Sequence, residues 1–415
     1  MTVKYFMVAL LLVGGLCGVF TIRVCKTFSS YYLNMIGQCT DNPNPDLTQA
    51  QIIKKWGFIA ENLEITTEDG YKITVVRGYH PTKRGRSPVV FGHGIVSNGY
   101  TWIDRDKKSL PYILGNLGHE FWITNWRGTK PSRKHLNMSD TESSFWKFSF
   151  HEVAAYDLKA IMEKVYDTTN QKSIYIGMSM GTTISFIFAS IYPSFADKTL
   201  SRIISLAPVA YLTDIPSILR YGVPYLDILE HFVSRNGQAF PSFEIPIQKY
   251  LCANTPHQYF LCNIVKGLVF GSNFDQLDPS TFPVTESLNY DSCSWNMIVH
   301  YSQIIKSNLF ARYNYGKPGN IIRYGNKYPP LYPVENITIP VILFVGKNDY
   351  LSTKQNADRL YNKLNTRVRC GYYTVADTRW DHVDFIEATD VTTILYPIVL
   401  NVIKSNITDI CTENV

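Results

Sequence analysis

The sequence lacks the features that would assign it to several large classes of protein. No run of lysine and arginine marks a surface for nucleic acid, and a net charge of +6 is modest for a chain of 415 residues. No internal repeat, low-complexity segment, nucleotide-binding loop or cluster of metal ligands is visible. We therefore expect no nucleic-acid partner, no metal and no cofactor.

A long membrane-spanning run is also missing. The apolar run at residues 5–20 is shorter than the ~20 residues that a spanning helix needs. It follows Lys4, and a small residue at Cys17 or Gly18 could be the cleavage site of a secretory signal. Basic residues come soon after the run, so an uncleaved signal anchor within residues 1–24 is the alternative.

Cysteines and glycosylation sequons indicate an oxidising compartment. The chain has eight cysteines, and N-x-S/T sequons occur at Asn137, Asn336 and Asn406. Removal of Cys17 with a signal would leave seven cysteines, which is an odd number. At least one thiol would then be free, or paired with another chain.

Strand-like and helix-like patterns alternate along most of the chain. The expected strands are 62–66, 72–77, 88–91, 121–125, 173–176, 202–206, 341–345 and 371–375. The expected helices are 47–56, 152–165, 182–191 and 391–404, the last with a kink at Pro397. This alternation predicts an α/β fold with a mostly parallel sheet, helices on both faces, and an active site at the C-terminal strand ends.

The alternation stops in the middle of the chain, between residues 211 and 335. This region is rich in Tyr, Phe and Pro, with helix-like pieces at 215–220, 226–233 and 297–307. We interpret it as a mostly helical cap and lid inserted between two parts of an α/β core. The core parts would span 25–210 and 336–415.

A G-x-S-x-G pattern at Gly177, Ser179 and Gly181 lies between an expected strand and an expected helix. A serine at the apex of such a turn has a strained backbone and an exposed hydroxyl. The glycines are needed because a Cβ there would clash with the neighbouring strand or helix. The pattern alone arises by chance in roughly one chain in ten, but its place between strand and helix favours a nucleophile.

Two later loops supply an acid and a base in the order that this arrangement requires. Asp349 follows the strand at 341–345, and His382 follows the strand at 371–375. His382 would take the proton of Ser179, and Asp349 would orient the imidazole and stabilise its cation. Three other carboxylates are weaker candidates for the acid: Asp214, Asp381 and Asp384.

An oxyanion formed at Ser179 needs backbone donors. Met180 begins the helix, so its N–H and the positive end of the helix dipole lie beside the serine. The N–H of Ile95, directly after His93 and Gly94, is the natural second donor. We interpret His93 as a structural residue of that turn, since His382 already supplies the base.

Several separated segments carry a resemblance to a known family. They read T-T-E-D-G-Y at 66–71, H-G-I at 93–95, N-W-R-G at 125–128, F-W-K-F-S-F-H-E-V-A-A-Y-D-L at 145–158, L-A-P-V-A at 206–210, K-S-N-L-F-A-R-Y-N-Y-G at 306–316 and D-H-V-D-F at 381–385. From about residue 56 to residue 403 the chain resembles the acid lipase family of α/β-hydrolases, the group of gastric and lysosomal acid lipases.

This resemblance implies a secreted or lysosomal serine esterase that acts on triacylglycerols or sterol esters at a lipid–water interface. It also implies a mobile lid within the cap, and a monomer or weak dimer. The family roles fall on Ser179 as nucleophile, Asp349 as acid, His382 as base, and the amides of Ile95 and Met180 as oxyanion donors. The lid-region disulfide of the family matches Cys252 and Cys262.

One departure from the family pattern is the turn itself, which reads G-M-S-M-G where the family usually has G-H-S-Q-G. Thioethers at Met178 and Met180 should make the pocket floor more apolar and alter acyl preference or rate. The methionines also support an alternative: a lipase-like lipid-binding or storage protein with little turnover. Acyl transfer to an alcohol by the same acyl-enzyme is a third possibility.

Overall fold

The computed structural model describes residues 22–33, 37–241 and 256–413. Most of the expected signal segment, residues 1–24, therefore lies outside the described residues. Among those described, no helix has both the length and the apolar character needed to cross a bilayer.

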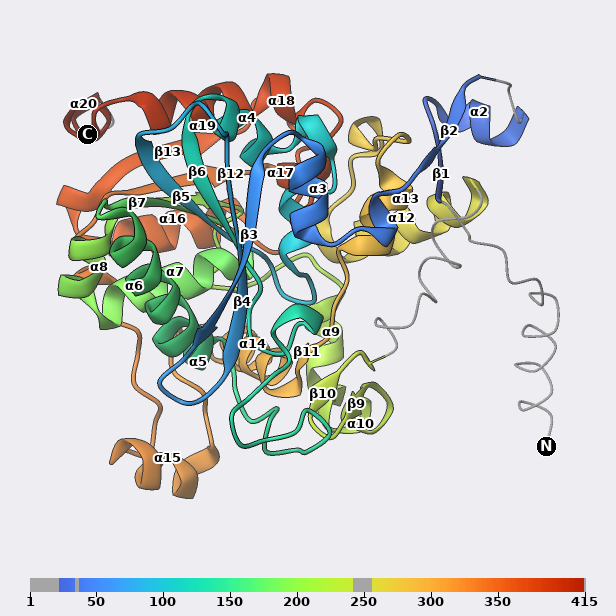
Figure 1. Ribbon diagram of the computed structural model, residues 1–415. Coiled ribbons are helices and arrows are strands. Elements are labelled where there is room, and N and C mark those ends of the chain that lie inside the picture. The colour runs from blue at the N-terminus through green and yellow to red at the C-terminus, as the bar shows by residue number, and fades with distance from the viewer. Residues whose placement is uncertain (1–21, 34–36, 242–255, 414–415) are drawn as a thin grey trace, which may run out of the picture.

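A twisted sheet of eight strands forms the centre of the molecule (Figure 1). Its order is β13-β12-β8-β7-β5-β6-β4-β3. The strands are β3 (Ile59–Thr66), β4 (Lys72–Tyr79), β5 (Arg86–Gly92), β6 (His119–Thr124), β7 (Ser173–Met178), β8 (Leu200–Leu206), β12 (Val341–Val345) and β13 (Arg369–Thr374). The six strands from β13 to β6 run parallel, and β4 and β3 add an antiparallel edge. The predicted α/β fold with a mostly parallel sheet is confirmed.

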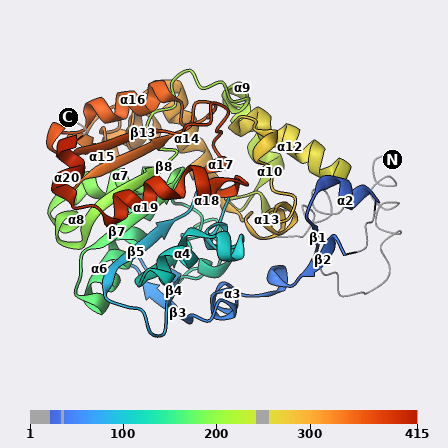
Figure 2. The same cartoon turned by 90° about the horizontal axis from the view of Figure 1, so that it is seen from above.

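Both faces of the sheet are covered, which is why every residue of β7 and β12 is buried. Side chains alternate between two cores: Tyr175 packs in one, and its neighbours Ile174 and Ile176 pack in the other. The first core includes α6 (Lys159–Thr169) and α7 (Met180–Ile191), whereas the second includes α4 (Leu110–Asn116) and α19 (Tyr396–Lys404). Figures 1 and 2 show these helices on opposite sides of the strands.

The helices of the core differ from expectation at several points. The helix expected at 152–165 is divided into α5 (Phe150–Glu152), a π-helical segment Val153–Leu158, and α6. The expected terminal helix is broken rather than kinked, because Pro397 lies in the first turn of α19, where its missing N–H costs nothing. The remaining core and terminal helices are α2 (Phe28–Leu33), α3 (Gln49–Lys55), α8 (Pro193–Thr199), α16 (Lys354–Lys363), α17 (Asp384–Glu387), α18 (Val391–Ile394) and α20 (Ile407–Glu413).

The described residues of 211–335 contribute no strand to the large sheet. They form α9 (Leu219–Gly222), α10 (Leu226–Val233), α12 (Pro256–Phe270), α13 (Phe282–Leu288), α14 (Trp295–Ser307), α15 (Gly316–Tyr324) and a small sheet of β9 (Ser234–Arg235), β10 (Gln238–Ala239) and β11 (Cys293–Ser294). The helix expected at 215–220 begins only at Leu219, because Pro216 disfavours the helical conformation at Ile215. The division into core and cap at 211 and 335 stays an interpretation.

Two disulfides close loops at the chain ends: Cys25–Cys39 joins β1 (Ile22–Cys25) to β2 (Cys39–Asn42), and Cys370–Cys411 joins β13 to α20. Within the described ranges Cys293 is the free thiol, and burial raises its pKa to about 12, so it is unreactive. Cys262 is disulfide-bonded. Its expected partner, Cys252, lies outside the described residues, and that pairing stays a prediction.

Candidate active site

Ser179 occupies a sharp turn between β7 and α7. Its φ of 53° and ψ of −118° are strained for a residue with a side chain. A Cβ on Gly177 would lie 2.7 Å from the backbone of Gly181, and a Cβ on Gly181 would lie 2.2 Å from the carbonyl oxygen of Gly92 in β5. Both glycines are therefore required by the close approach of strand, turn and helix.

The structure brings Ser179 together with the acid and base expected from the sequence. The Ser179 hydroxyl lies 2.8 Å from Nε2 of His382, and Nδ1 of His382 lies 2.9 and 3.0 Å from the two carboxylate oxygens of Asp349. All three side chains are buried. A proton can pass from the hydroxyl to the imidazole while the carboxylate accepts the hydrogen bond from Nδ1.

Asp349 is held by its own loop. Its Oδ1 accepts hydrogen bonds from the N–H groups of Leu351 and Ser352, at 2.8 and 2.7 Å. A Cβ on Gly346 would lie 2.4 Å from the carbonyl oxygen of Trp380, so the loops after β12 and β13 pack against each other directly. This packing sets the acid beside the base.

The weaker acid candidates do not contact the imidazole. Asp381 accepts the N–H groups of Val383 and Asp384, and Asp384 accepts the N–H of Asp381, so this pair shapes the turn that carries His382. Burial raises the pKa of Asp384 to about 7. Asp214 is exposed in a turn.

Phe270, at the end of cap helix α12, contacts His382, and the sequence did not predict this contact. Its carbonyl oxygen accepts the N–H of Tyr350 and the N–H of His382, both at 3.2 Å. Its ring stacks on the imidazole of His382 with centroids 5.7 Å apart and planes within 8°. No local pattern could have signalled this contact, because it joins three segments that are distant in the chain.

The two expected oxyanion donors lie beside the serine. Met180 is the first residue of α7, so its N–H has no acceptor within the helix. The main chain before Ile95 also approaches Ser179, since a Cβ on Gly94 would lie 3.5 Å from the serine Cβ. An oxyanion at the serine would thus meet a helix N-terminus on one side and the Gly94–Ile95 turn on the other.

His93 braces this turn. Its Nδ1 lies 2.8 Å from the carbonyl oxygen of Gly94, and Nε2 lies 3.2 Å from the N–H of Trp126. Burial lowers the pKa of His93 to about 3, so the ring is neutral and ties the end of β5 to the end of β6.

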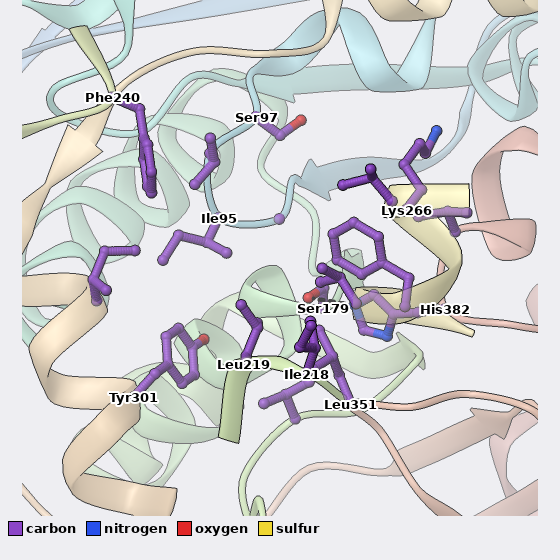
Figure 3. Close-up of a pocket in the computed structure, with 18 of the residues that line it drawn as sticks. Ile95, Ser97, Ser179, Ile218, Leu219, Phe240, Lys266, Tyr301, Leu351 and His382 are labelled. Atoms are coloured by element: carbon purple, nitrogen blue, oxygen red, sulfur yellow. Dashed lines mark hydrogen bonds between the residues drawn. The ribbon is translucent and has the colours of Figure 1, made fainter. Parts of the chain in front are cut away.

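Ser179 and His382 open into a cavity of about 1060 Å³ between the sheet edge and the cap (Figure 3). Its walls are mainly apolar and come from distant parts of the chain, including Ile95, Leu219, Phe240, Tyr301 and Leu351. Met178 also lines the cavity, whereas Met180 packs in the core beneath it. The expectation of an apolar floor therefore applies to Met178 alone.

A buried ion cluster lies in the cavity wall. Nζ of Lys266 lies 2.9 Å from Glu286 and 2.6 Å from Glu387. Burial by itself would lower the pKa of Lys266, but the two carboxylates hold it well above its usual value. The cluster joins cap helix α12 to α13 and α17, close to the base.

Residues expected to carry glycans are accessible. Asn137, Asn336 and Asn406 are all exposed. Their glycosylation stays a prediction. No group of side chains among the described residues is arranged to hold a metal ion.

The sheet and the serine turn define an α/β-hydrolase, and comparison with known proteins agrees. A family model described as the alpha/beta hydrolase fold matches residues 87–232, and one described as a partial alpha/beta-hydrolase lipase region matches residues 49–106. The monoglyceride lipase of Saccharomyces cerevisiae has a similar fold, with a TM-score of 0.52 and 17% identity over 83% of this chain and 96% of that one.

Curated relatives are similar over most of the chain. Gastric triacylglycerol lipase of Mus musculus is 32% identical over 84% of this chain and 89% of its own length. Lysosomal acid lipase/cholesteryl ester hydrolase of Homo sapiens is 30% identical over 88% and 92%, and Lipase 1 of Drosophila melanogaster is 31% identical over 86% and 80%. The chain belongs to the acid lipase family of α/β-hydrolases and is a carboxylic ester hydrolase of the lipase type.

Proposed function

We propose that this chain hydrolyses the ester bonds of neutral lipids, triacylglycerols or sterol esters, through an acyl-enzyme at Ser179. The observation that carries the proposal is the chain of hydrogen-bonding contacts from Ser179 through His382 to Asp349, which opens into a large apolar cavity. The names of the relatives support the choice of substrate, since they include a triacylglycerol lipase and a cholesteryl ester hydrolase.

In the first half-reaction, the Ser179 oxygen attacks the ester carbonyl while Nε2 of His382 accepts the hydroxyl proton. The negative charge on the carbonyl oxygen is stabilised by the N–H groups of Met180 and Ile95. His382 then gives its proton to the departing alcohol as the carbon–oxygen bond breaks. The acyl chain stays on the serine as an ester.

In the second half-reaction, His382 takes a proton from water, and the resulting nucleophile attacks the acyl ester. Collapse of the second oxyanion returns the proton to Ser179 and releases a fatty acid. The apolar cavity wall favours the acyl chain over water throughout, because each buried methylene contributes about 0.8 kcal/mol.

We further propose that the chain passes through the secretory pathway and acts outside the cell or in the lysosome, as a monomer or weak dimer. The apolar run at residues 5–20, the exposed sequons and the disulfides support this location. The cap would include a mobile lid, with Cys252 and Cys262 paired within it.

The test is a panel of triacylglycerols, cholesteryl esters and short-chain esters, assayed from pH 4 to pH 8. An active-site phosphonate should label the protein and should not label a Ser179→Ala variant. Hydrolysis of at least one long-chain ester with labelling of Ser179 is the expected result. Lipid binding without labelling would instead favour a storage protein, and transfer to an added alcohol in place of hydrolysis would favour an acyltransferase.

A further inference from the structure

The segment 312–331 begins against α14, where Asn314 bonds to Gln303, and its middle part projects from the molecule. It contains α15, which projects at the lower end of the molecule in Figure 1. Its apolar side chains face solvent: Ile322 is 85% exposed and Tyr328 is 70% exposed, with Ile321 and Leu331 about half exposed. Single exposed apolar residues are ordinary, but four on one projecting segment indicate a contact surface.

The same segment is basic. It carries Arg312, Lys317, Arg323 and Lys327, and residues 307–334 contain no aspartate or glutamate. None of the four cations forms an ion pair with another described residue. Burial raises the pKa of Tyr313 and of Tyr315, and nearby carboxylates raise them further: Glu230 and Glu152 act on Tyr313, and Glu152 acts on Tyr315. The carboxylate of Glu152 already accepts the N–H of Ser149.

Hydrogen bonds within the segment hold the exposed side chains in place. The side chain of Asn320 is buried; it accepts the N–H of Tyr315 at 2.9 Å and donates to the Asn314 side chain and the Lys327 carbonyl at 2.8 and 3.0 Å. The Tyr324 hydroxyl donates to the carbonyl of Tyr313 at 3.0 Å. The segment thus holds a fixed shape that presents Ile322 outwards.

The segment follows α14, whose Tyr301, Ser302 and Ile305 line the cavity. Figure 1 shows α10 and α15 both in the lower part of the molecule, apart from each other. Leu226 and Leu229 of α10 line the cavity, while Ile228 on the same helix is exposed. Helix α10 therefore presents apolar side chains both to the cavity and to the outside, in the lower part of the molecule that α15 also occupies (Figure 1).

We propose that segment 312–331 anchors the enzyme to a phospholipid surface of negative charge, with its cations on the headgroups and Ile322 among the acyl chains. Basic and apolar side chains on one face have this combined affinity for anionic lipid. The proposal rests on the proposed function in one respect, because it takes the phospholipid surface that the enzyme binds to be the one that carries the ester substrate. Anchoring at this segment is separate from catalysis at Ser179.

The experiment measures binding to vesicles of phosphatidylcholine alone and of phosphatidylcholine with about one-third phosphatidylserine. Each basic residue near an anionic surface contributes about 1 kcal/mol, or about five-fold in affinity. Combined Lys317→Gln, Arg323→Gln and Lys327→Gln substitutions should thus weaken binding to the anionic vesicles roughly 100-fold. The effect on phosphatidylcholine alone should be less than two-fold.

The control variant combines Lys164→Gln, Lys363→Gln and Arg367→Gln, which remove the same charge from exposed positions elsewhere on the core. It should bind almost as the native chain does. Equal losses in both variants would mean that net charge alone drives binding, and no loss in the first would place the anchor elsewhere; either result overturns the proposal.

Ile322→Ser tests the apolar part without changing charge. Burial of such a side chain contributes about 1.5 kcal/mol, so binding to both kinds of vesicle should fall about ten-fold. An unchanged affinity would contradict insertion. In every variant phosphonate labelling of Ser179 should match that of the native chain, so a failure of the proposed catalytic function would be seen separately from a failure of anchoring.

Discussion

The two walls of the cavity are built on different principles. The floor, at the sheet edge, holds Ser179, Asp349 and His382 among buried groups whose hydrogen bonds and glycine contacts leave little freedom. The roof, formed by α9, α10, α12 and the residues beside α9, has many exposed apolar side chains: Ile218, Leu219, Tyr221, Leu261 and Val265 line the cavity, and Tyr225, Ile228, Phe260 and Leu268 are exposed without lining it. The difference teaches that the floor fixes the positions of Ser179, Asp349 and His382, whereas the roof supplies apolar surface.

The C-terminal part of α12 joins the roof to the floor. Phe270 and Lys266 both belong to α12, and each reaches polar groups beside His382 or in α17. Ser272 and Asn273, which follow α12, also bond to Asn348 and Asp384, so this junction connects the cap to the loops that carry Asp349 and His382. Substitutions on either side of this junction test how separate the two walls are.

The largest effect is expected on the floor, at Asp349. Asp349→Asn keeps the shape but cannot hold the imidazole tautomer that accepts the serine proton, so kcat on a soluble short-chain ester should fall about 10⁴-fold. Asp214→Asn is the matched control, because that carboxylate is exposed and lies outside the hydrogen-bonded chain. A comparable loss in Asp214→Asn, or near-native rates in Asp349→Asn, would show that the acid is misassigned.

The floor could be predicted from the sequence because its signals are local. Ser179 lies in a pattern of glycines, and Asp349 and His382 each follow a clear strand, so topology alone brings them to one edge. The sequence predicts the strand at 341–345 with its observed bounds because every residue in it is apolar, and the structure shows every one of them buried.

The roof could not be predicted in this way. Its helices are short, and the side chains that matter make contacts across the chain, as Phe270 does with His382. The sequence pattern places Pro216 and Pro397 inside helices, although Pro216 precedes α9 and Pro397 lies in the first turn of α19. Where the hydrophobic residues show no strong helical period, tertiary packing decides where a helix begins and ends.

A smaller effect is expected at the junction. Phe270→Leu keeps the backbone hydrogen bonds but removes the ring that stacks on His382, and an aromatic pair contributes about 0.5–1.5 kcal/mol. The kcat on a soluble ester should fall roughly three- to ten-fold, because the imidazole loses the ring that positions it.

Leu268→Ala is the control for this prediction, since Leu268 lies on the same helix but is half exposed and does not line the cavity. It should leave kcat unchanged. If Phe270→Leu lowers only thermal stability, the ring has a packing role and floor and roof are more independent than the stacking indicates.

An effect of similar size, but on acyl preference and not on kcat, is expected within the floor itself, where the two methionines should differ. Met178 lines the cavity, so Met178→His should lower the preference for long over short acyl chains about three- to ten-fold in kcat/KM, because a polar ring replaces apolar wall. Met180 packs in the core, so Met180→Gln should leave this preference unchanged and instead cost about 1–3 kcal/mol of stability through a buried amide. Chain-length profiles and denaturant unfolding of each single variant measure the two effects. A change in acyl preference from Met180→Gln would mean that the cavity extends below the serine turn, and an unchanged profile in Met178→His would mean that the roof alone selects the acyl chain.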